Sequence, residues 1–317
     1  MKSTTTNGQE RSLTVIVCTH NPLLDYLQRA LEGLKKQSLA KDRWELIVVD
    51  NGSAQPLEGR IDLSWHGSAR VEVESALGLT PARLCGIRQA RTPLLVFVDD
   101  DNILQSDYLE TALRIADEHS FLGAWGGQIT LEFESTPPDW TRQFWPFLAE
   151  RPVPRALWSN LSNSVETVPW GAGMCVRASV GRAYAEHLAA DEARQRFDRR
   201  GQQLTSGGDI DLALTACDLG LGTGVFPDLK LIHLIPPTRL DEKYLLRLVE
   251  GTHYSMVLVM AKHMGKPSRV PIPPLRRFLG KWLRFARLPA RERRFFEARL
   301  QGEEGAIRWL LAESADK

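Results

Sequence analysis

The sequence predicts an α/β fold, with a Rossmann-like and mostly parallel sheet flanked by helices, on two observations. Short apolar runs occur at residues 13–17, 46–49 and 94–98, and each run is continuous rather than alternating. Continuous runs of this length are typical of strands that are buried on both faces of a sheet. Amphipathic helical patterns separate the runs, and strands that alternate with helices indicate a parallel sheet with right-handed crossovers.

The helices between these strands are predicted from their first residues. Asn21 suits a helix cap and Pro22 suits the first helical position, and apolar residues at helical spacing follow them. Thr80 and Pro81 repeat this order ahead of residues 82–90. We therefore expect Asn21 and Thr80 to cap two helices.

The second half of the chain is less regular, because prolines interrupt residues 137–154. A helix is expected at residues 209–219 and a strand at residues 230–235, and the pair Pro236-Pro237 marks the clearest boundary. The expected organisation is a flexible N-terminus at residues 1–12, a main domain at 13–238 and a helical C-terminal extension at 239–317.

Composition and charge narrow the class of protein. The 317 residues are 43% hydrophobic, which is enough for one sizeable core with an appendage, and the net charge of +1 gives no indication of a nucleic-acid partner. We find no secretory signal and no apolar run long enough to span a membrane. The four cysteines lie far apart, as expected of buried reduced thiols. A cytoplasmic protein is therefore expected.

Polar residues follow each of the three predicted strands. Because parallel strands bring their carboxyl ends to one rim of the sheet, these residues are expected to lie close together. Carboxylates so placed would repel one another unless a divalent cation neutralised them, and Mg²⁺ or Mn²⁺ often completes its ligands with substrate phosphates. The rim therefore predicts a metal and a phosphorylated ligand. Its residues are Thr19, His20 and Asn21; Asp50, Asn51, Gly52 and Ser53; and Asp99, Asp100, Asp101 and Asn102.

At this point the sequence resembles a known family. The segments VIVCTHN (15–21), VVDNGS (48–53), GLTPARLCG (78–86) and FVDDDN (97–102), followed by GGDIDL (207–212) and His233, are similar to the motifs of family-2 glycosyltransferases with the A-type fold. The resemblance covers about residues 13–240. Each motif alone could be a turn, a helix cap or a core histidine, but their joint order indicates the family.

The resemblance implies a role for each residue on the donor side. Asp50 would accept a hydrogen bond from the imide N–H of the base, which fits uracil and guanine because both offer a donor there. Thr19 and Asn21 would line the base and ribose pocket, and Arg83 would bind the nucleotide phosphates.

The acidic motif and the late histidine are implied to hold the sugar and the metal. Asp99 and Asp101 match the two acids of the family's D-x-D motif. Asp99, with its neighbour Asp100, would bind the ribose or the sugar. Asp101 would bind the Mn²⁺ or Mg²⁺ ion that bridges the diphosphate, and His233 would be a second contact to metal or phosphate.

Asp209 is implied to be the general base that deprotonates the acceptor hydroxyl. The family usually has Glu-Asp where this chain has Gly208 and Asp209, so the orientation of Asp209 is open. Asp211 is the alternative base, but residues two apart on a helix do not share a face, and this favours Asp209.

Tryptophans are frequent between residues 125 and 170, where they either stack on an acceptor sugar or fill the core. Trp170 and Gly171 resemble the family's acceptor-facing segment, in which glycines let the backbone approach the ligand. The five tryptophans are Trp125, Trp140, Trp145, Trp158 and Trp170.

Residues 275–287 have the pattern of a basic amphipathic helix with Trp282 and Phe285 on its apolar side. Such a helix either anchors a protein at an anionic membrane surface or packs its apolar face on the main domain, and both give the same pattern. In the first case the protein would be peripheral at the inner face of the cell membrane.

Taken together, the resemblance implies a metal-dependent inverting glycosyltransferase. It would move a sugar from a nucleoside diphosphate, with UDP expected, to a hydroxyl of a saccharide or lipid-linked acceptor in bacterial polysaccharide or glycolipid synthesis. One alternative is a sugar nucleotidyltransferase, which would need a glycine-rich phosphate loop with a basic residue, and residues 18–24 have none. The other is a sugar-nucleotide-binding subunit without turnover, suggested by Gly208.

Overall fold

The structure of the protein is a computed structural model that describes residues 12–190, 194, 197, 204–265 and 288–315. Its strands are β1 (Leu13–Thr19), β2 (Trp44–Asp50), β3 (Ala69–Val73), β4 (Leu94–Asp99), β5 (Asn102–Leu104), β6 (Leu122–Phe133), β7 (Leu157–Ser159), β8 (Cys175–Arg177) and β9 (Gly222–Ile235).

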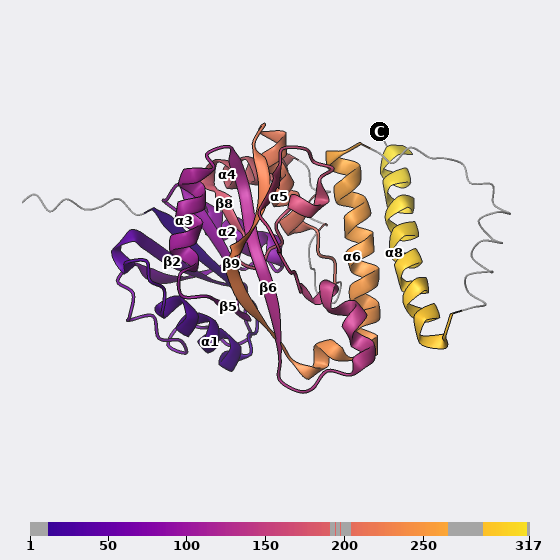
Figure 1. The fold of residues 1–317 in the computed structure, drawn as a ribbon, viewed down its shortest axis with the longest axis horizontal. Coiled ribbons are helices and arrows are strands. Elements are labelled where there is room, and N and C mark those ends of the chain that lie inside the picture. Colours follow the sequence, from indigo (N-terminus) through magenta and orange to yellow (C-terminus); the bar gives the residue numbers. More distant parts are fainter. Residues whose placement is uncertain (1–11, 191–193, 195–196, 198–203, 266–287, 316–317) are drawn as a thin grey trace, which may run out of the picture.

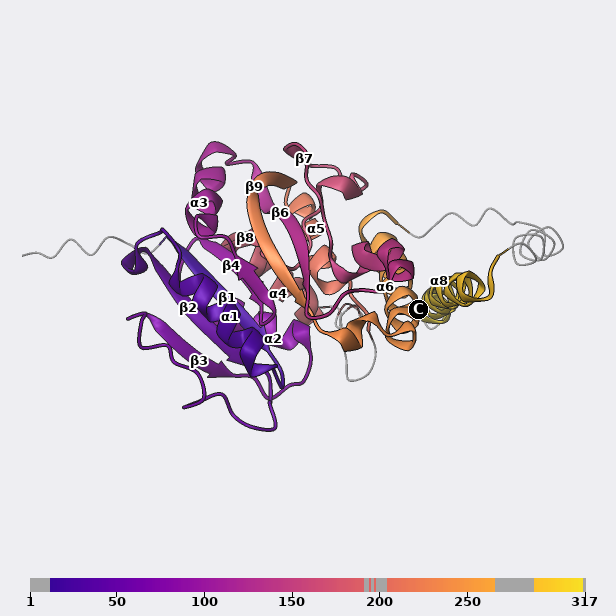
Figure 2. The ribbon, with the colours of Figure 1, turned by 60° about the horizontal axis from the view of Figure 1, so that its bottom comes forward.

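The described strands form one nine-stranded sheet in the order β3-β2-β1-β4-β8-β6-β9-β5, with β7 also paired to β9 (Figures 1 and 2). The pairs β3-β2, β2-β1, β1-β4 and β6-β9 are parallel. β8 runs antiparallel to both β4 and β6, and β5 and β7 run antiparallel to β9. The three predicted apolar runs are confirmed as the neighbouring parallel strands β2, β1 and β4. The strand expected at residues 230–235 is the second part of the longer strand β9.

Helices cover both faces of this sheet. The α-helices are α1 (Leu24–Lys35), α2 (Leu79–Gln89), α3 (Tyr108–Glu118), α4 (Ala178–Ala190), α5 (Gly208–Asp218), α6 (Glu242–His263) and α8 (Ala290–Ala315). Short 3₁₀ helices are η1 (Lys41–Arg43), η2 (Asp139–Leu148), η3 (Val165–Thr167) and η5 (Pro237–Leu240).

Alternate residues of the parallel strands enter two separate cores. Val15 and Val17 of β1 pack in the core under α1 and α3, whereas Ile16 packs in the core under α2, α4 and α5. Figure 2 shows α1 lying over β1 and β2. Every residue of β1 and β2 is buried, and each fully buried aliphatic side chain contributes about 1.5–3 kcal/mol to folding. Burial on both faces is the reason that these strands appear in the sequence as continuous apolar runs.

The chain after β9 forms a helical layer at one end of the sheet. The helices α6 and α8 lie side by side (Figure 1), and they share a third core with η2, built around Phe144, Leu248 and Phe295. The C-terminal part of α6 also reaches the second core through Leu258 and Val259. The expected C-terminal helices are therefore present, while the domain boundary at residue 238 stays a prediction.

Two expectations lie mainly outside the described residues. They are the flexible N-terminus at 1–12, of which only Ser12 is described, and the basic helix at 275–287. Within the described parts of the chain, no helix combines the length and the apolar character needed to cross a membrane.

Both predicted helix caps were wrong, although both helices exist. The helix α1 has Leu23 as its N-cap, because Asn21 has a left-handed backbone (φ 49°) and its amide Oδ1 accepts the Ala54 N–H at 2.8 Å. The helix α2 has Gly78 as its N-cap, with φ 134°, a conformation that side chains disfavour. Thr80 therefore lies in the first turn. In both cases contacts outside the helix determine where it begins.

Candidate active site

A cavity of about 650 Å³ opens at the carboxyl ends of β1, β2 and β4. The parallel register places Thr19 beside Asp50 and Cys18 beside Asp99, as expected for adjacent strand ends. All the predicted site residues except Asn21 and Asp50 line this cavity: Thr19, Arg83, Asp99, Asp100, Asp101, Trp170, Gly171, Asp209 and His233.

Three consecutive carboxylates form the acidic wall of the cavity. Asp99 ends β4, and the Thr19 hydroxyl donates a hydrogen bond to Asp100 from the end of β1. Burial and the neighbouring charge of Asp101 raise the pKa of Asp100 to about 7, since both disfavour a further negative charge. The Asn102 side chain donates to Asp101 Oδ1 at 2.9 Å. The wall is thus a place where a cation is stabilised.

The short strand β5 brings Asp101 close to His233. Asn102 pairs with His233 in the β5–β9 register, and the Leu234 N–H donates to the Asp101 carbonyl at 2.9 Å. His233 Nε2 then lies 3.3 Å from Asp101 Oδ2. His233 Nδ1 lies 2.8 Å from the Leu148 carbonyl, which can only accept, so Nδ1 carries the proton and a neutral ring keeps a lone pair on Nε2.

These two atoms fit the metal that the family resemblance implies. A carboxylate oxygen and an imidazole nitrogen with a fixed tautomer are both suitable ligands for Mn²⁺, and a backbone carbonyl behind the histidine is a common second partner. No group of three His, Cys, Asp or Glu side chains in metal-binding arrangement occurs among the residues described. The remaining ligands would have to come from water and the donor phosphates, as is usual for Mg²⁺.

Sequence analysis missed Arg239, which contacts both of these residues from η5. Its Nη2 lies 2.8 Å from Asp101 Oδ2, and its Nη1 lies 2.9 Å from His233 Nε2. Burial disfavours the charge of the guanidinium, but the Asp101 carboxylate beside it raises the pKa of Arg239 above its usual range. The only signal in the sequence was a cationic residue shortly after His233.

Asp209 lies in the first turn of α5 and is oriented by backbone groups. The Gly171 N–H donates to its Oδ2 at 2.8 Å, and the Ile210 N–H donates to its Oδ1 at 2.9 Å. An added Cβ on Gly171 would lie 2.7 Å from Arg83 Nη2 and 3.1 Å from Asp209 Oδ2. The glycine therefore leaves room for Arg83 and Asp209 to come together. The Gly171 amide orients Asp209 although Gly208 replaces the acidic neighbour usual in the family.

Asp211 points away from the cavity. Its side chain is fully buried, and its Oδ1 lies 2.7 Å from His263 Nε2. Of the two acids considered as the base, Asp209 is the one that lines the cavity.

Asp50 lies just behind the cavity and organises the loop after β2. Its two carboxylate oxygens accept the N–H groups of Ser53 and Leu57, each at 3.0 Å. Burial alone would raise the pKa of Asp50, but hydrogen bonds from Ser53 and Leu57 lower it. Asn21 lies at the exposed rim, where its N–H donates to Ser53 Oγ at 2.9 Å.

Asn51, the next residue, was expected at the rim, but the family resemblance assigned it no role. Its side-chain amide donates to the carbonyls of Glu74 at 3.0 Å and Ala76 at 2.7 Å, and its Oδ1 accepts the Gly78 N–H at 2.8 Å. These bonds hold the segment before α2, where Leu77 and Gly78 form one wall of the cavity.

Trp170 is the one tryptophan of the five that lines the cavity. The Arg151 guanidinium lies 4.9 Å from the centroid of its ring, a cation–π contact that fixes the ring. Trp125 is instead fully buried in the core, and Trp158 is half exposed on the surface. Another part of the cavity lining comes from η2, its C-cap Ala149 and α6, and it is mostly apolar: Pro146, Phe147, Leu148, Ala149, Tyr244, Leu248, Thr252 and Met256.

Two relatives each match about a third of the chain. EpsH of Bacillus subtilis (strain 168), which carries a provisional glycosyltransferase name, is 29% identical over 113 residues, or 35% of this chain and 32% of EpsH. The uncharacterised protein y4gI of Sinorhizobium fredii (strain NBRC 101917 / NGR234) is 29% identical over 111 residues, or 34% of this chain and 12% of y4gI. The matches thus span a third or less of each relative.

Solved structures of S. aureus TarS residues 1–349 share the fold. The complexes with UDP and with UDP-GlcNAc each match with a TM-score of 0.50, at 15% and 14% identity, over 93% of this chain and 89% of TarS 1–349. The family model described as "Glycosyl transferase family 2" matches residues 14–184, which is more than half of the chain and includes the strand ends that carry the acidic rim. The chain is therefore a member of glycosyl transferase family 2.

Proposed function

We propose that the protein transfers a sugar from a UDP-sugar donor to a hydroxyl acceptor, with inversion at the anomeric carbon and with a divalent cation. One observation carries the proposal: a single cavity of about 650 Å³ is lined by the arginine Arg83, the carboxylate Asp209 and the pair Asp101–His233. These groups match the three needs of the reaction, which are phosphate binding, deprotonation of the acceptor and stabilisation of the leaving diphosphate.

Asp209 is proposed to remove the proton from the acceptor hydroxyl. Each of its oxygens accepts one backbone N–H, at 2.8 Å and 2.9 Å, and each keeps a further lone pair for the acceptor. The acceptor oxygen then attacks the anomeric carbon while the bond to the donor phosphate breaks, and one displacement inverts that carbon. Held by Asp101 and His233, a divalent cation would stabilise the charge on the departing diphosphate. Arg83 would hold the same phosphates by charge-assisted hydrogen bonds.

UDP is the proposed nucleotide because the TarS structures that share this fold contain UDP and UDP-GlcNAc. Asp50 is proposed to accept the imide N–H of uracil with a lone pair that the Ser53 and Leu57 N–H groups leave free. We further propose that the acceptor is a saccharide or a lipid-linked sugar of polysaccharide or glycolipid synthesis. An apolar wall of η2 and α6 residues is suited to the less polar part of such an acceptor.

The first experiment measures release of free sugar from UDP-, GDP- and dTDP-sugars with Mn²⁺, with Mg²⁺ and with excess chelator. Slow hydrolysis of one UDP-sugar that stops with chelator supports the proposal. Tight binding without any turnover, with or without acceptors, would instead support a binding subunit. Formation of a UDP-sugar from UTP and a sugar phosphate would support a nucleotidyltransferase.

The Asp209→Asn variant tests the proposed base. Because the amide cannot take a proton but retains the shape of the side chain, we expect turnover to fall by about 10²–10⁴-fold. We expect UDP affinity, measured by calorimetry, to stay nearly unchanged. The matched control is Asp62→Asn, which alters an exposed aspartate whose Oδ1 also accepts a backbone N–H, that of Ser64 at 2.9 Å. Loss of UDP binding in Asp209→Asn would show that Asp209 belongs to the donor site.

A further inference from the structure

Arg239 occupies a position that no part of the proposed reaction explains. It lies in η5, the short turn between β9 and α6, and its side chain is 24% exposed at the wall of the cavity. Its two terminal nitrogens divide between two partners, with Nη2 at 2.8 Å from Asp101 Oδ2 and Nη1 at 2.9 Å from His233 Nε2. The guanidinium thus bridges the two residues that the proposed function assigns to the metal.

The two contacts use the same atoms that a metal would use. With the His233 ring proton on Nδ1, facing the Leu148 carbonyl at 2.8 Å, Nε2 has a single lone pair. That lone pair can accept an Arg239 N–H or coordinate a cation, and it cannot do both. Asp101 Oδ2 lies 3.3 Å from the same nitrogen, so a cation bound to both atoms at about 2.0–2.2 Å would occupy the space into which the guanidinium hydrogens point.

The negative charges of the neighbouring carboxylates explain the position of the guanidinium. Asp99, Asp100 and Asp101 follow one another at the end of β4, and a cation beside them lowers their mutual repulsion. Arginine stays charged at every pH at which the protein folds, so it can neutralise the wall before any metal arrives. When a metal takes over this task, the guanidinium becomes free to bind another anion, and the donor diphosphate is the anion that enters this cavity under the proposed function.

We propose that Arg239 is a resident cation of the metal site. In the donor-free enzyme it holds Asp101 and His233, and it exchanges these partners for donor phosphate oxygens when the metal and the nucleotide enter together. This inference rests on the proposed function, because it takes the metal and the diphosphate from it. Its consequence is that metal and nucleotide bind cooperatively: Mn²⁺ alone must displace Arg239 without a new partner for it, whereas Mn²⁺ with UDP supplies that partner.

The experiment measures Mn²⁺ affinity by electron paramagnetic resonance, with and without UDP, in wild type, Arg239→Ala and Arg239→Gln. In wild type we expect weak binding of Mn²⁺ alone and binding at least about tenfold tighter with UDP, within the usual range of coupling between two ligands. In both variants we expect Mn²⁺ alone to bind about tenfold tighter than in wild type, and the gain from UDP to shrink. The glutamine variant, which retains polar groups without the charge, provides the result if the alanine variant does not fold.

The control is Arg29→Gln, which removes a guanidinium that is 2.7 Å from Glu132 on the exposed surface. It should leave Mn²⁺ affinity unchanged. If wild type binds Mn²⁺ with UDP but the Arg239 variants bind Mn²⁺ alone no tighter than wild type does, the inference is wrong and the proposed function stands. If wild type binds no Mn²⁺ even with UDP, the proposed metal site fails, and the inference fails with it.

Discussion

At the scale of single residues, Gly171 shows how closely the site is packed. It lies between Arg83 and Asp209, and it contributes an N–H to Asp209 rather than a side chain. A methyl group in this place would meet Arg83 Nη2 at 2.7 Å, which is shorter than any normal contact to a Cβ atom. The end of an arginine side chain can move, so the added methyl would displace the guanidinium rather than unfold the protein.

We therefore predict that Gly171→Ala folds normally but loses turnover. Displacement of Arg83 by about 1 Å is expected to lower kcat/KM on the order of 10²-fold, because the donor phosphates and the general base must be held in the correct relative positions. Steady-state kinetics and the melting temperature together check this prediction. Gly67→Ala is the control, because a Cβ there would meet no atom within 4 Å. A large drop in the melting temperature of Gly171→Ala, with kcat/KM retained, would show that Gly171 matters for packing only.

The residue scale also shows what could be predicted from the sequence. The acidic residues Asp99 to Asp101 were found because they directly follow an apolar run, and a strand end is a local feature. Arg239 could not be found in the same way, because its partner Asp101 reaches it through the pairing of β5 with β9. The strand β5 has three residues, too few to give a recognisable pattern, and its partner is distant in the chain. Contacts of this kind depend on tertiary structure.

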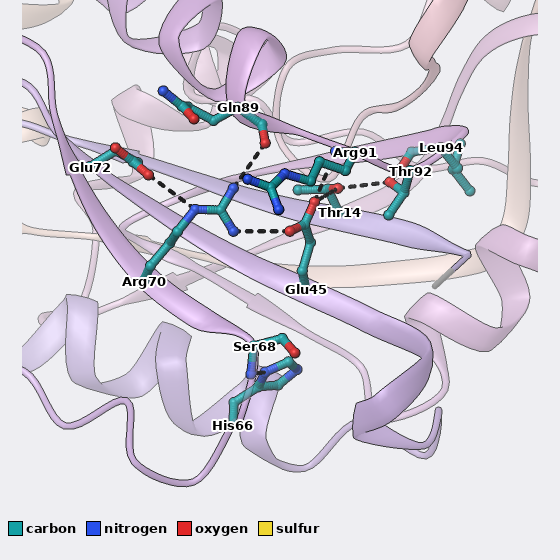
Figure 3. A network of polar contacts seen from close by, with 10 residues as sticks. All are labelled: Thr14, Glu45, His66, Ser68, Arg70, Glu72, Gln89, Arg91, Thr92 and Leu94. Atoms are coloured by element: carbon teal, nitrogen blue, oxygen red, sulfur yellow. Dashed lines mark hydrogen bonds and ion pairs between the residues drawn. The ribbon is translucent and has the colours of Figure 1, made fainter. Parts of the chain in front are cut away.

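At the scale of elements, the amino ends of β1 and β2 are joined by a buried carboxylate, far along the strands from the active site. Glu45 accepts hydrogen bonds from the Thr14 hydroxyl at 2.7 Å, the Arg91 N–H at 3.0 Å and the Arg70 guanidinium at 2.9 Å. Figure 3 shows these partners around the Glu45 carboxylate. Burial alone would raise the pKa of Glu45, but the bonds from Arg70 and Thr14 lower it below its usual 4.5. The ionised form is therefore part of the folded state.

We predict that Glu45→Gln lowers the free energy of unfolding by about 1.5–3 kcal/mol at pH 7, the range for a hydrogen bond to a charged group. A lowered folded-state pKa contributes stability above the unfolded pKa, and this contribution is lost as the pH falls through the folded value. The difference between wild type and variant should consequently shrink below about pH 4. Urea unfolding from pH 3 to pH 8 measures it. Glu72→Gln removes the more exposed partner of Arg70 and should cost only about 0–1 kcal/mol.

The contact of α6 with α8 depends on a glycine. A Cβ on Gly302 of α8 would overlap the carbonyl oxygen of Glu250 in α6, and a backbone atom cannot turn away as a side chain can. A Cβ on Gly305, three residues further along α8, would meet Tyr254 at an ordinary 3.4 Å. A side chain therefore fits at Gly305 but not at Gly302, although both glycines lie on α8.

We predict that Gly302→Ala forces the two helices apart and lowers the free energy of unfolding by about 1–3 kcal/mol. Gly305→Ala should be neutral or should stabilise α8 by up to about 1 kcal/mol, because alanine favours helices more than glycine does. Thermal unfolding and limited proteolysis of the two variants compare these outcomes directly. Equal destabilisation by both substitutions would mean that α6 and α8 are not packed as closely as their glycines indicate.

Among the strands and helices, some features could be predicted from the sequence and others could not. The parallel strands could be predicted because burial on both faces leaves a continuous apolar run, and α5 was placed to within one residue. The helix starts at Leu24 and Leu79 could not, because Asn21 is held by the loop after β2 and Gly78 by Asn51. Those partners come together only after the sheet has formed.

At the scale of the whole molecule, α6 connects the active site to the rest of the fold. The helix begins shortly after Arg239, and its residues Tyr244 and Met256 line the cavity. Its last turn carries His263, whose side chain is fully buried against α5. There His263 Nε2 lies 2.7 Å from Asp211 Oδ1, and His263 Nδ1 lies 3.2 Å from Asp218 Oδ1.

This buried cluster should make the stability of the molecule depend on pH. Burial alone would lower the pKa of His263, but hydrogen bonds to Asp211 and Asp218 raise it above its usual 6.5. Arg194, a further cation among the residues described, lies 3.6 Å from Asp211 and 3.9 Å from Asp218, and His187 lies on the Asp218 side of the cluster. Two carboxylates therefore face His263, and the protonated ring is the form that the fold stabilises.

A raised folded-state pKa contributes stability that is fully present below the unfolded value and is lost as the pH rises through the folded one. We therefore predict that His263→Gln lowers the free energy of unfolding most below about pH 6.5, and that the difference from wild type shrinks as the pH rises above that value. Urea unfolding from pH 5.5 to pH 9 measures the difference. The control is His253→Gln, a histidine of the same helix whose Nδ1 contacts the Val249 carbonyl at 2.8 Å. The same pH trend in both variants would show that it does not arise from the Asp211–His263–Asp218 contacts. Because α6 joins this cluster to the cavity, the loss of this stabilisation at high pH should also make the part of the cavity lined by Tyr244 and Met256 more mobile.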